Sequence, residues 1–460
     1  MYFRLLTLTN LNEMKKVFLV LGIVLFQVAQ AQEHFAGIGL SKRVGLLNAS
    51  VNPAELTNLS SNFEVGLFTM SLNISNNKIG FKDLVNSDDI ESLLYSGDEP
   101  VNMRIDVLAN GPAFGMRLKK WSFGVATSAV IKANIIDVDV ALGKALSDSG
   151  INSILGFENI KSSYNQKINA ATWGEIGFTV ARELFDNEKF KWSLGTNMRV
   201  LFPSSFANLA IDKLDGALIN TAGDFKLNNT TANLNIAYAG PLANGFEGSN
   251  NYGNFFSSGI NGFAVDFGIN FKIKNSKDKD SYNFNSGLSI KNIGSMTFRG
   301  DNSQTTNYNL NISSTEFLDL NDFQDVKSLE EAEQLLTDSG FLTKTSTSKD
   351  FTIKLPSVIN AYVDLRLSKR FYISAFTQQK LVDDSDNKFT TTQNNITITP
   401  RFSGKNYEFF VPLSSNEISG FAGGFGLRVR GFFIGSGSLM TAIINDSKQA
   451  DFYMGFRIGI

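Results

Sequence analysis

Asn261–Ile273 reads Asn-Gly-Phe-Ala-Val-Asp-Phe-Gly-Ile-Asn-Phe-Lys-Ile. Apolar residues occupy every second position from Phe263 to Ile273, and small, polar or charged residues fill the positions between them. A β-strand directs alternate side chains to opposite faces, so the stretch predicts a strand with one apolar face. In a soluble protein this face would pack in the core. In an outer-membrane barrel it would meet lipid, and the polar face would line the interior.

The composition suits a large exported barrel and argues against several other classes. The chain has 460 residues, a formal net charge of −2 and no cysteine. The near-neutral charge leaves no electrostatic footprint for nucleic acid. Without cysteine there can be no disulfide, thiolate metal site, cysteine nucleophile or lipid-modified cysteine. Mean hydropathy is close to zero despite 40 phenylalanines, which is too polar for a helical membrane protein and usual for a barrel.

The first residues predict a secretory signal peptide. Met14–Lys16 precedes an apolar run over 17–28, and Ala29–Ala31 has the small-residue pattern of a cleavage site. We therefore expect cleavage between Ala31 and Gln32. A membrane anchor is the alternative, but the run is shorter than the roughly 18 apolar residues of a spanning helix. Export without a later membrane-spanning helix indicates a bacterial envelope protein that passes the inner membrane.

The chain is expected to divide into three parts. Residues 1–31 form an N-terminal extension plus signal peptide, 32–62 a periplasmic lead-in, and 63–460 a transmembrane β-barrel. The lead-in has no alternating segment, but it contains Asn52 and Pro53. Proline disfavours helix at the residue before it and is well suited to begin a short helix. We expect this segment to fold into the barrel mouth.

Alternating segments recur after residue 62, and they predict an all-β, antiparallel barrel of roughly 14 strands with both termini in the periplasm. The predicted strands are 63–75, 102–118, 121–134, 169–183, 190–202, 259–274, 282–297, 350–367, 371–382, 393–402, 406–412, 419–429, 430–436 and 450–460. Short charged turns alternate with long connections, as in barrels with short periplasmic turns and long extracellular loops. The long connections are 76–101, 135–168, 203–258 and 298–349. A secreted soluble β-protein is the alternative.

Parts of the long connections carry patterns of their own. Ser328 is a suitable N-cap residue, and acidic residues follow it in the first turn, so we expect a helix over 328–336. A weaker pattern predicts a helix over 88–94. The segment 225–238 is expected to form a hairpin with 206–213.

The last strand is the second strong signal for a barrel. Apolar residues alternate from Phe452 to Ile460, with Tyr453, Gly455, Arg457 and Gly459 between them. A terminal strand of this pattern is what outer-membrane barrels present to the insertion machinery, which we therefore expect as a partner beside outer-membrane lipid. The final residue is usually Phe, and Ile460 departs from that pattern.

Several short motifs, taken in their order, resemble one family. They are Asn52-Pro53-Ala54, Ala113-Phe114-Gly115-Met116, Trp121-Ser122-Phe123-Gly124, Val138-Asp139, 262–268 and Gly435-Ser436-Gly437. Together they resemble an uncharacterised family of Bacteroidota outer-membrane proteins, predicted to form barrels distantly similar to the long-chain fatty-acid transporters. The resemblance covers nearly all of the mature chain. It implies an outer-membrane barrel. Its Asn-Pro-Ala element is similar to one near the N-terminal hatch of those transporters, which implies that Asn52 and Pro53 are hatch residues. It implies no particular substrate.

Little in the sequence supports catalysis. His34 is the single histidine, and we expect it to be a flexible surface residue, so a Ser-His hydrolase has no base. Histidine-rich metal sites are excluded for the same reason. Asp384–Asn387 resembles a calcium loop only faintly and is expected to be a solvated loop, because it lacks the required Gly and Glu. No catalytic, metal or cofactor-binding residue is predicted.

Charged residues within the strands lie on the parity opposite to the apolar face. A charge facing lipid at the midplane would cost about 2–4 kcal/mol for Arg or Lys, so these side chains should point into the lumen. They could form a self-satisfied network that stiffens the barrel, which we favour, or a polar constriction that guides a solute. The candidates are Arg104, Asp106, Asp266, Lys272, Asp364, Arg366 and Arg457.

The leading functional prediction is a transport channel that passes small molecules, including hydrophobic ones, and is gated by its lumen and hatch. The alternative is a structural or partner-binding barrel whose long surface loops engage another envelope protein. An enzyme is the least favoured class.

Overall fold

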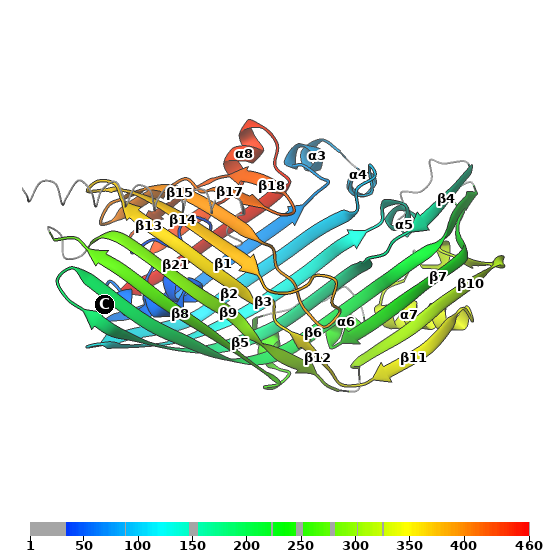
Figure 1. The fold of residues 1–460 in the computed structure, drawn as a ribbon, viewed down its shortest axis with the longest axis horizontal. Coiled ribbons are helices and arrows are strands. Elements are labelled where there is room, and N and C mark those ends of the chain that lie inside the picture. Colours follow the sequence, from blue (N-terminus) through cyan, green and yellow to red (C-terminus); the bar gives the residue numbers. More distant parts are fainter. Residues whose placement is uncertain are drawn as a thin grey trace, which may run out of the picture.

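A single antiparallel sheet closes on itself to form a barrel (Figure 1). The computed structural model describes residues 34–87, 89–146, 155–221, 224–244, 252–276, 281–300, 302–323 and 326–459. The first strand, β1 (Phe63–Asn76), pairs with β2 (Val101–Leu118) on one side and with the last strand, β21 (Gln449–Gly459), on the other. This last pairing closes the wall of the barrel. The predicted cleavage site at Ala31 and Gln32 lies outside the described residues.

The wall has 14 strand positions, the number that the sequence predicts. From β2 it continues through β3 (Trp121–Val138), β5 (Asn165–Asp186), β6 (Phe190–Thr221), β8 (Gly262–Lys274), β9 (Tyr282–Phe298), β13 (Val358–Arg366), β14 (Phe371–Lys380) and β15 (Asn395–Ser403). The predicted strand 350–367 is divided into β12 (Phe351–Lys354) and β13, both paired with β9. Two further positions are also divided: β16 (Tyr407–Phe410) with β17 (Leu413–Asn416), and β18 (Gly420–Gly423) with β19 (Phe425–Val429). The remaining strand, β20 (Phe432–Ser436), pairs with β21.

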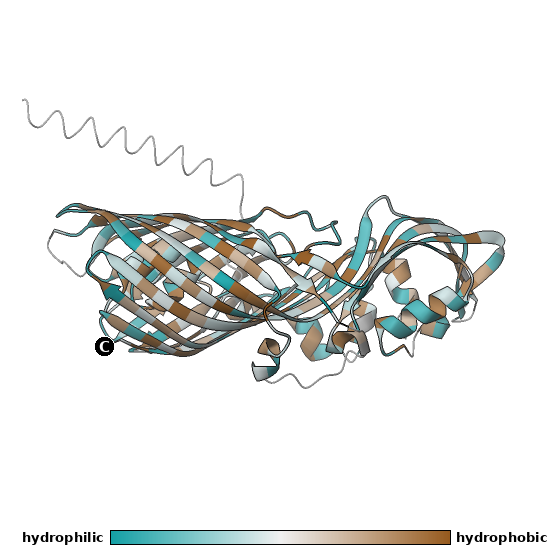
Figure 2. Ribbon diagram, turned by 90° about the horizontal axis from the view of Figure 1, so that it is seen from below, coloured by the Kyte–Doolittle hydropathy of each residue, from teal (hydrophilic) through white to brown (hydrophobic). Residues whose placement is uncertain are grey.

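The alternation in the sequence becomes the inside and outside of the barrel. In β8, Phe267 and Ile269 are 53% and 43% exposed, whereas Asp266 and Asn270, which flank them in the strand, are buried. Figure 2 shows apolar residues alternating with polar ones along the barrel strands. An exposed apolar belt on a closed barrel is the surface that a lipid bilayer covers. None of the helices in the described part of the chain is long and apolar enough to span a bilayer.

Aromatic side chains gather beside the short turns. Trp192 packs on Phe271 at a ring distance of 4.7 Å, and Phe371 packs on Phe402 at 5.1 Å. Trp121 stacks on Phe123 next to the turn at 119–120. A girdle of aromatic residues marks the interface between membrane and water in outer-membrane barrels, so the end of the barrel with the short turns lies at one such interface.

Beyond the other end of the barrel, the sheet continues into a lobe. The lobe consists of β4 (Leu155–Lys161), the outer part of β6, β7 (Asp224–Ala239), β10 (Gln304–Asp319) and β11 (Leu342–Ser348). The helices α5 (Val140–Ala145), α6 (Pro241–Asn244) and α7 (Leu329–Asp338) accompany it (Figure 1). Apolar side chains of the strands and helices, including Leu234, Ile236 and Leu329, form its own core.

The lobe corrects one prediction and confirms two. The connections 135–168, 203–258 and 298–349 were expected to be mainly loops, which is wrong, because their apolar residues pair into strands that cover a core. The hairpin between 206–213 and 225–238 is confirmed by the pairing of β6 with β7. The helix predicted over 328–336 is confirmed as α7, with the Ser328 side chain accepting a hydrogen bond from Glu331 N.

The remaining described helices are short and lie in the connections. The predicted helix over 88–94 is confirmed as α4 (Ile90–Leu94). The others are α3 (Phe81–Asn86), η3 (Tyr252–Phe256), η4 (Asn321–Phe323) and α8 (Leu439–Ile444), besides α2 (Leu46–Val51) and η1 (Pro53–Asn58) of the N-terminal segment.

Candidate functional site

The N-terminal segment, residues 34–62, folds back into the barrel as a plug (Figure 1). Its helices α2 and η1 bury most of their side chains, and Leu56 and Leu59 are almost fully enclosed. The Asn52 side chain caps η1 by accepting a hydrogen bond from Ala54 N, and Pro53 occupies the first helical position. Proline suits this position because its missing N–H would have no partner there. Asn52 and Pro53, predicted as hatch residues, therefore lie within the lumen.

The plug is attached to the barrel wall through side-chain hydrogen bonds. Asn52 Nδ2 donates to Ile269 O at 2.8 Å. Glu55 Oε1 accepts hydrogen bonds of 2.9 Å from both Asn270 Nδ2 and Asn285 Nδ2, and one from the Tyr362 hydroxyl. Buried polar groups that are hydrogen-bonded avoid a large desolvation cost, so the buried Glu55 carboxylate fixes the plug at one place on the wall.

Two paired glycines make room for the plug. Gly195 of β6 lies opposite Gly268 of β8. A Cβ at Gly268 would overlap the Asn52 side chain, and one at Gly195 would overlap the backbone of Pro53 and Ala54. Glycine inside a strand often marks such a close approach of another backbone. The lack of a side chain at Gly268 therefore has a structural reason.

A second set of contacts holds the plug beside the short turns. Leu46 N donates to Glu64 Oε1 at 2.7 Å, and Glu64 also pairs with Arg457. Ser41 Oγ donates to the buried Glu408 at 2.8–2.9 Å. The Tyr453 hydroxyl donates to Ala36 O at 2.6 Å. The plug thus contacts the last strand as well as the middle of the barrel.

Beside the plug, the lumen contains a cavity of about 260 Å³. Its apolar lining includes Leu108, Val130, Trp173, Leu355 and Phe376, and its polar lining includes Glu175, Arg199, Asp266, Asn360 and Gln378. Plug residues such as Leu47 and Val51 form part of its boundary. The cavity can accommodate a small molecule with a large apolar surface and a few polar atoms.

Buried charges on the inner face of the wall are paired. Arg199 bridges Glu175 at 2.9 Å and Asp266 at 2.7 Å. Asp106 pairs with Lys132. Burying such a pair costs desolvation free energy, and removing one partner leaves the other as an unpaired buried charge.

A larger cluster joins four strands. Arg401 Nη2 lies 2.7 Å from Asp364 Oδ2, and Arg401 Nε lies 2.9 Å from Glu408 Oε1. Arg428 Nε contacts the other oxygen of Glu408 at 2.9 Å. All four side chains are at most 2% exposed. The cluster ties β13, β15, β16 and β19 together inside the barrel.

The predicted lumen residues do not form one site. Asp106, Asp266 and Asp364 belong to the three separate groups just described, and Arg104 lies buried at the end away from the short turns. Arg457 lies at the plug, next to Glu64. Two others, Lys272 and Arg366, are half-buried: Lys272 Nζ lies 5.0 Å from the centre of the Tyr282 ring, and Arg366 donates to the backbone of Ser368 and Lys369 in a short turn.

Several residues of the lumen were not singled out from the sequence. Glu175 lies on the parity opposite Ile176 and Phe178, so the alternation rule could have found it. Glu55 and Asp384 carried no such signal, because they lie in segments without alternation. His34, expected at the flexible surface, is partly buried and lies 3.0 Å from Ser71 Oγ, which corrects that prediction. Among the described residues, no group of three or more His, Asp or Glu could hold a metal ion.

A closed antiparallel barrel with an apolar outer belt, an aromatic girdle and a buried polar interior defines the class of the protein: an outer-membrane β-barrel protein. Within that class, the chain belongs to the family of unknown function DUF5723, whose model matches residues 53–437. Membership agrees with the predicted resemblance to an uncharacterised family.

The chain resembles several solved structures at low sequence identity. The chain is similar to the "TodX deltaS2S3 mutant monoaromatic hydrocarbon channel" (11% identity, 93% of this chain and 99% of that chain, TM-score 0.45). It is also similar to the toluene transporter TodX of Pseudomonas putida (10% identity, 90% of this chain and 94% of that chain, TM-score 0.41). A third similar structure is the translocator domain of the autotransporter NalP from Neisseria meningitidis (5% identity, 86% of this chain and 89% of that chain, TM-score 0.31). No curated protein matches the sequence.

Proposed function

We propose that the protein is an outer-membrane channel that passes small molecules with an apolar body, and that the plug gates it. The observation that carries this proposal is the cavity of about 260 Å³ that both the plug and the barrel wall line. A purely structural barrel has no need of a space for a ligand next to a folded-in terminal segment. No covalent chemistry is part of the proposal.

The cavity lining supports a solute that is mainly apolar. Trp173 and Phe376 contribute aromatic surface, and Leu108, Val130 and Leu355 contribute aliphatic surface. The charged residues at its edge are engaged with one another, as Arg199 is with Asp266. In this proposal the paired charges stiffen the wall, and the apolar surface contacts the solute.

The plug is suited to gating because hydrogen bonds, and no covalent link, hold it to the middle of the wall. Net contributions of hydrogen bonds to charged groups are about 1.5–3 kcal/mol each. Loss of the bonds at Asn52 and Glu55 would therefore raise the population of states in which η1 leaves the lumen.

The test is solute flux through liposomes that contain the purified protein. We compare the wild type, the variant Asn52→Ala/Glu55→Ala, and the control Glu158→Ala, an exposed residue of the lobe. Small aromatic solutes and a neutral sugar of similar size serve as probes. We expect the plug variant to raise the flux of the aromatic probe about tenfold over the wild type, as a shift of about 1.4 kcal/mol would, and the control to leave it unchanged.

Flux through the plug variant that does not exceed the flux of protein-free liposomes would overturn the proposal. Heat-modifiable gel mobility confirms that each variant is a folded barrel before the flux is measured. A preference for the sugar over the aromatic probe would overturn the apolar substrate class while leaving the channel itself in place.

The lobe favours a second candidate function, binding of another envelope protein. It has its own core, and within the described part of the chain its strands β4 and β11 each pair with a single neighbour, β6 and β10 respectively. Strands of this kind can accept a further strand from a partner. Chemical cross-linking in intact cells, with reactive groups placed at exposed positions of β11, would reveal a partner by a specific cross-linked product.

The cellular route completes the proposal. It includes cleavage between Ala31 and Gln32, insertion of the barrel by the machinery that recognises the last strand, and residence in a Bacteroidota outer membrane with the short turns in the periplasm. Sequencing the N-terminus of the mature protein tests the first of these steps.

A further inference from the structure

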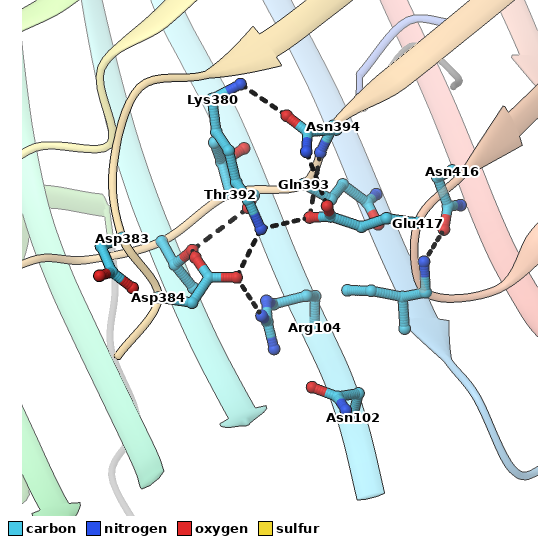
Figure 3. A network of polar contacts seen from close by, with 12 residues as sticks. Asn102, Arg104, Lys380, Asp383, Asp384, Thr392, Gln393, Asn394, Asn416 and Glu417 are labelled. Carbon is cyan, nitrogen blue, oxygen red and sulfur yellow. Dashed lines mark hydrogen bonds and ion pairs between the residues drawn. The ribbon is translucent and has the colours of Figure 1, made fainter. Parts of the chain in front are cut away.

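The connection between β14 and β15, residues 381–394, crosses the inside of the barrel, and we call it the strap. Its segment 384–387 was expected to be a solvated loop, and these four residues are exposed or half-buried. Farther along the strap, Thr390, Thr391, Thr392 and Gln393 are at most 2% exposed. Figure 3 shows the strap reaching from Lys380 toward Arg104 of β2.

The strap joins opposite sides of the wall. Between β2 and β14 lie the positions of β3, β5, β6, β8, β9 and β12/β13 in one direction. In the other direction lie β1, β21, β20, β18/β19, β16/β17 and β15. Six positions separate the two strands on each side, so β2 and β14 face each other across the lumen. A contact from the strap to β2 therefore spans the barrel.

Asp384 makes that contact. Its Oδ2 atom lies 3.2 Å from Arg104 Nη2 and 2.6 Å from Lys380 Nζ (Figure 3). Thr391 of the strap donates a hydrogen bond to the other oxygen. Lys380 is held in turn by Glu417 at 2.7 Å. The carboxylate thus links one cation from each side of the barrel.

Arg104 is fixed in position to receive Asp384. Its Nη1 atom donates to Met103 O and to Ile135 O, and its side chain is 2% exposed. Charge-assisted hydrogen bonds of this kind are stronger than neutral ones. The Arg104–Asp384 pair is therefore a preformed attachment point on the far wall.

Contacts with β5 and β12 hold the strap elsewhere. Asn165 Nδ2 donates to Ser385 O at 2.7 Å, and Lys167 Nζ donates to Asp386 O at 2.9 Å. On β12, Lys354 N donates to Lys388 O at 2.7 Å. Most of these bonds end on backbone oxygens of the strap, and the ion pair with Arg104 is its charged link to β2.

The strap also borders the cavity. Thr392 is one of the lining residues, as is Gln378 of β14, whose amide donates to Gln393 O at 3.2 Å. The strap connects strand ends at the side of the barrel away from the short turns, whereas Glu64 anchors the plug near those turns. The cavity thus has the plug as one boundary and the strap as another.

We propose that the strap is a second gate of the cavity and that the Arg104–Asp384 ion pair is its latch. The proposal rests on the channel function proposed above and adds to it control of access from the outer side. Arg104 and Asp384 act as positioning residues: they hold the strap and do not contact the solute.

Access to the cavity can be measured independently of transport. Because the chain has no cysteine, Val130→Cys places one reporter thiol in the cavity lining. We measure the rate at which a small methanethiosulfonate modifies this thiol in three proteins. They are Val130→Cys alone, Val130→Cys with Arg104→Ala, and Val130→Cys with Arg299→Ala. Arg299 forms an exposed ion pair with Asp350 and serves as the matched control. We expect Arg104→Ala to accelerate the reaction about tenfold, equivalent to about 1.4 kcal/mol, and Arg299→Ala to leave it unchanged.

A second variant tests closure directly. In Arg104→Cys/Asp384→Cys, a short bis-methanethiosulfonate can tie the strap to β2, because each of its two reactive groups forms a reducible disulfide with one Cys and releases a sulfinate. In liposomes we expect the cross-link to suppress solute flux in the plug variant Asn52→Ala/Glu55→Ala, and reduction to restore it.

The outcomes separate the two proposals. An unchanged labelling rate in folded Arg104→Ala overturns the latch, and so does flux that the cross-link fails to reduce. Faster labelling of the reporter without flux in any variant supports the strap as a gate and overturns the channel function. Heat-modifiable mobility of each variant shows whether the barrel itself is intact.

Discussion

Glu55 of the plug and Asn270 of β8 form a hydrogen bond of 2.9 Å inside the barrel. Asn270 lies on the polar face of the strand whose alternation is most regular, between the exposed Ile269 and the half-buried Phe271. One face of β8 thus meets lipid while the other holds the N-terminal segment. The alternation of side chains that gives the strand an apolar face for the membrane also directs the amides that bind the plug into the lumen.

Enlarging Gly268 should loosen the plug. In Gly268→Ala the new Cβ would overlap the Asn52 side chain, and overpacking of this kind costs about 1–3 kcal/mol. We expect faster trypsin cleavage after Lys42 or Arg43, detected by mass spectrometry. Gly66→Ala is the control, because the nearest atom to its Cβ would be 3.4 Å away. Equal cleavage in both variants would show that Gly268 does not determine the fit of the plug.

Removing Arg401 should destabilise the barrel strongly. Arg401→Met leaves Asp364 and Glu408 buried without their shared cation, and breaking a buried pair costs about 3–5 kcal/mol. The measurement is the denaturant midpoint of the loss of heat-modifiable mobility. Arg430→Met, at an exposed position of the turn before β20, should leave that midpoint unchanged. A midpoint for Arg401→Met equal to that of the wild type would refute the role of the cluster.

A charge on the outer face of β8 should oppose membrane insertion. Phe267 is 53% exposed on the apolar belt, and an Arg facing lipid at the bilayer midplane costs about 2–4 kcal/mol. We expect Phe267→Arg to fold into lipid vesicles with a lower yield than the wild type, and Phe267→Leu to match the wild type. Folding assays at equal lipid concentration give the yields. Equal yields for all three proteins would place Phe267 outside the bilayer.

The barrel could be predicted from the sequence because its physical signal is local. Alternation in a stretch such as 262–274 depends only on neighbouring residues, and each predicted strand has a counterpart in the wall. The lobe was missed because its strands follow barrel strands without a break: β6 runs from Phe190 to Thr221 and passes from the wall into the lobe. Apolar side chains of this one strand therefore face lipid in the wall and pack into a core in the lobe.

The partners of the charged residues could not be predicted, because they depend on contacts between distant parts of the chain. Arg104 and Asp384 are separated by 280 residues. The parity of Arg104 indicates that it faces inward, but nothing in its strand indicates which residue it meets. The Asp384 segment resembles a solvated turn, and only closure of the barrel brings it opposite β2.

Titration of Tyr308 should report the docking of α7 in the lobe. The Tyr308 hydroxyl donates to Glu333 Oε1 at 2.6 Å, and Tyr238 donates to the other oxygen at 2.8 Å. Burial, together with the hydrogen bond to Glu333, raises the pKa of Tyr308 from 10.0 to about 12. Since the folded-state pKa is the higher one, the stabilising contribution is complete below about pH 10 and is lost as the pH rises through about 12.

The absorbance difference between wild type and Tyr308→Phe, followed at the tyrosinate band, should therefore have its midpoint near pH 12 in the folded protein and near the ordinary tyrosine value of about 10 in guanidinium. Glu333→Gln removes the negative charge and should lower the folded midpoint. A folded midpoint that already lies near pH 10 in the wild type would mean that α7 does not cover Tyr308.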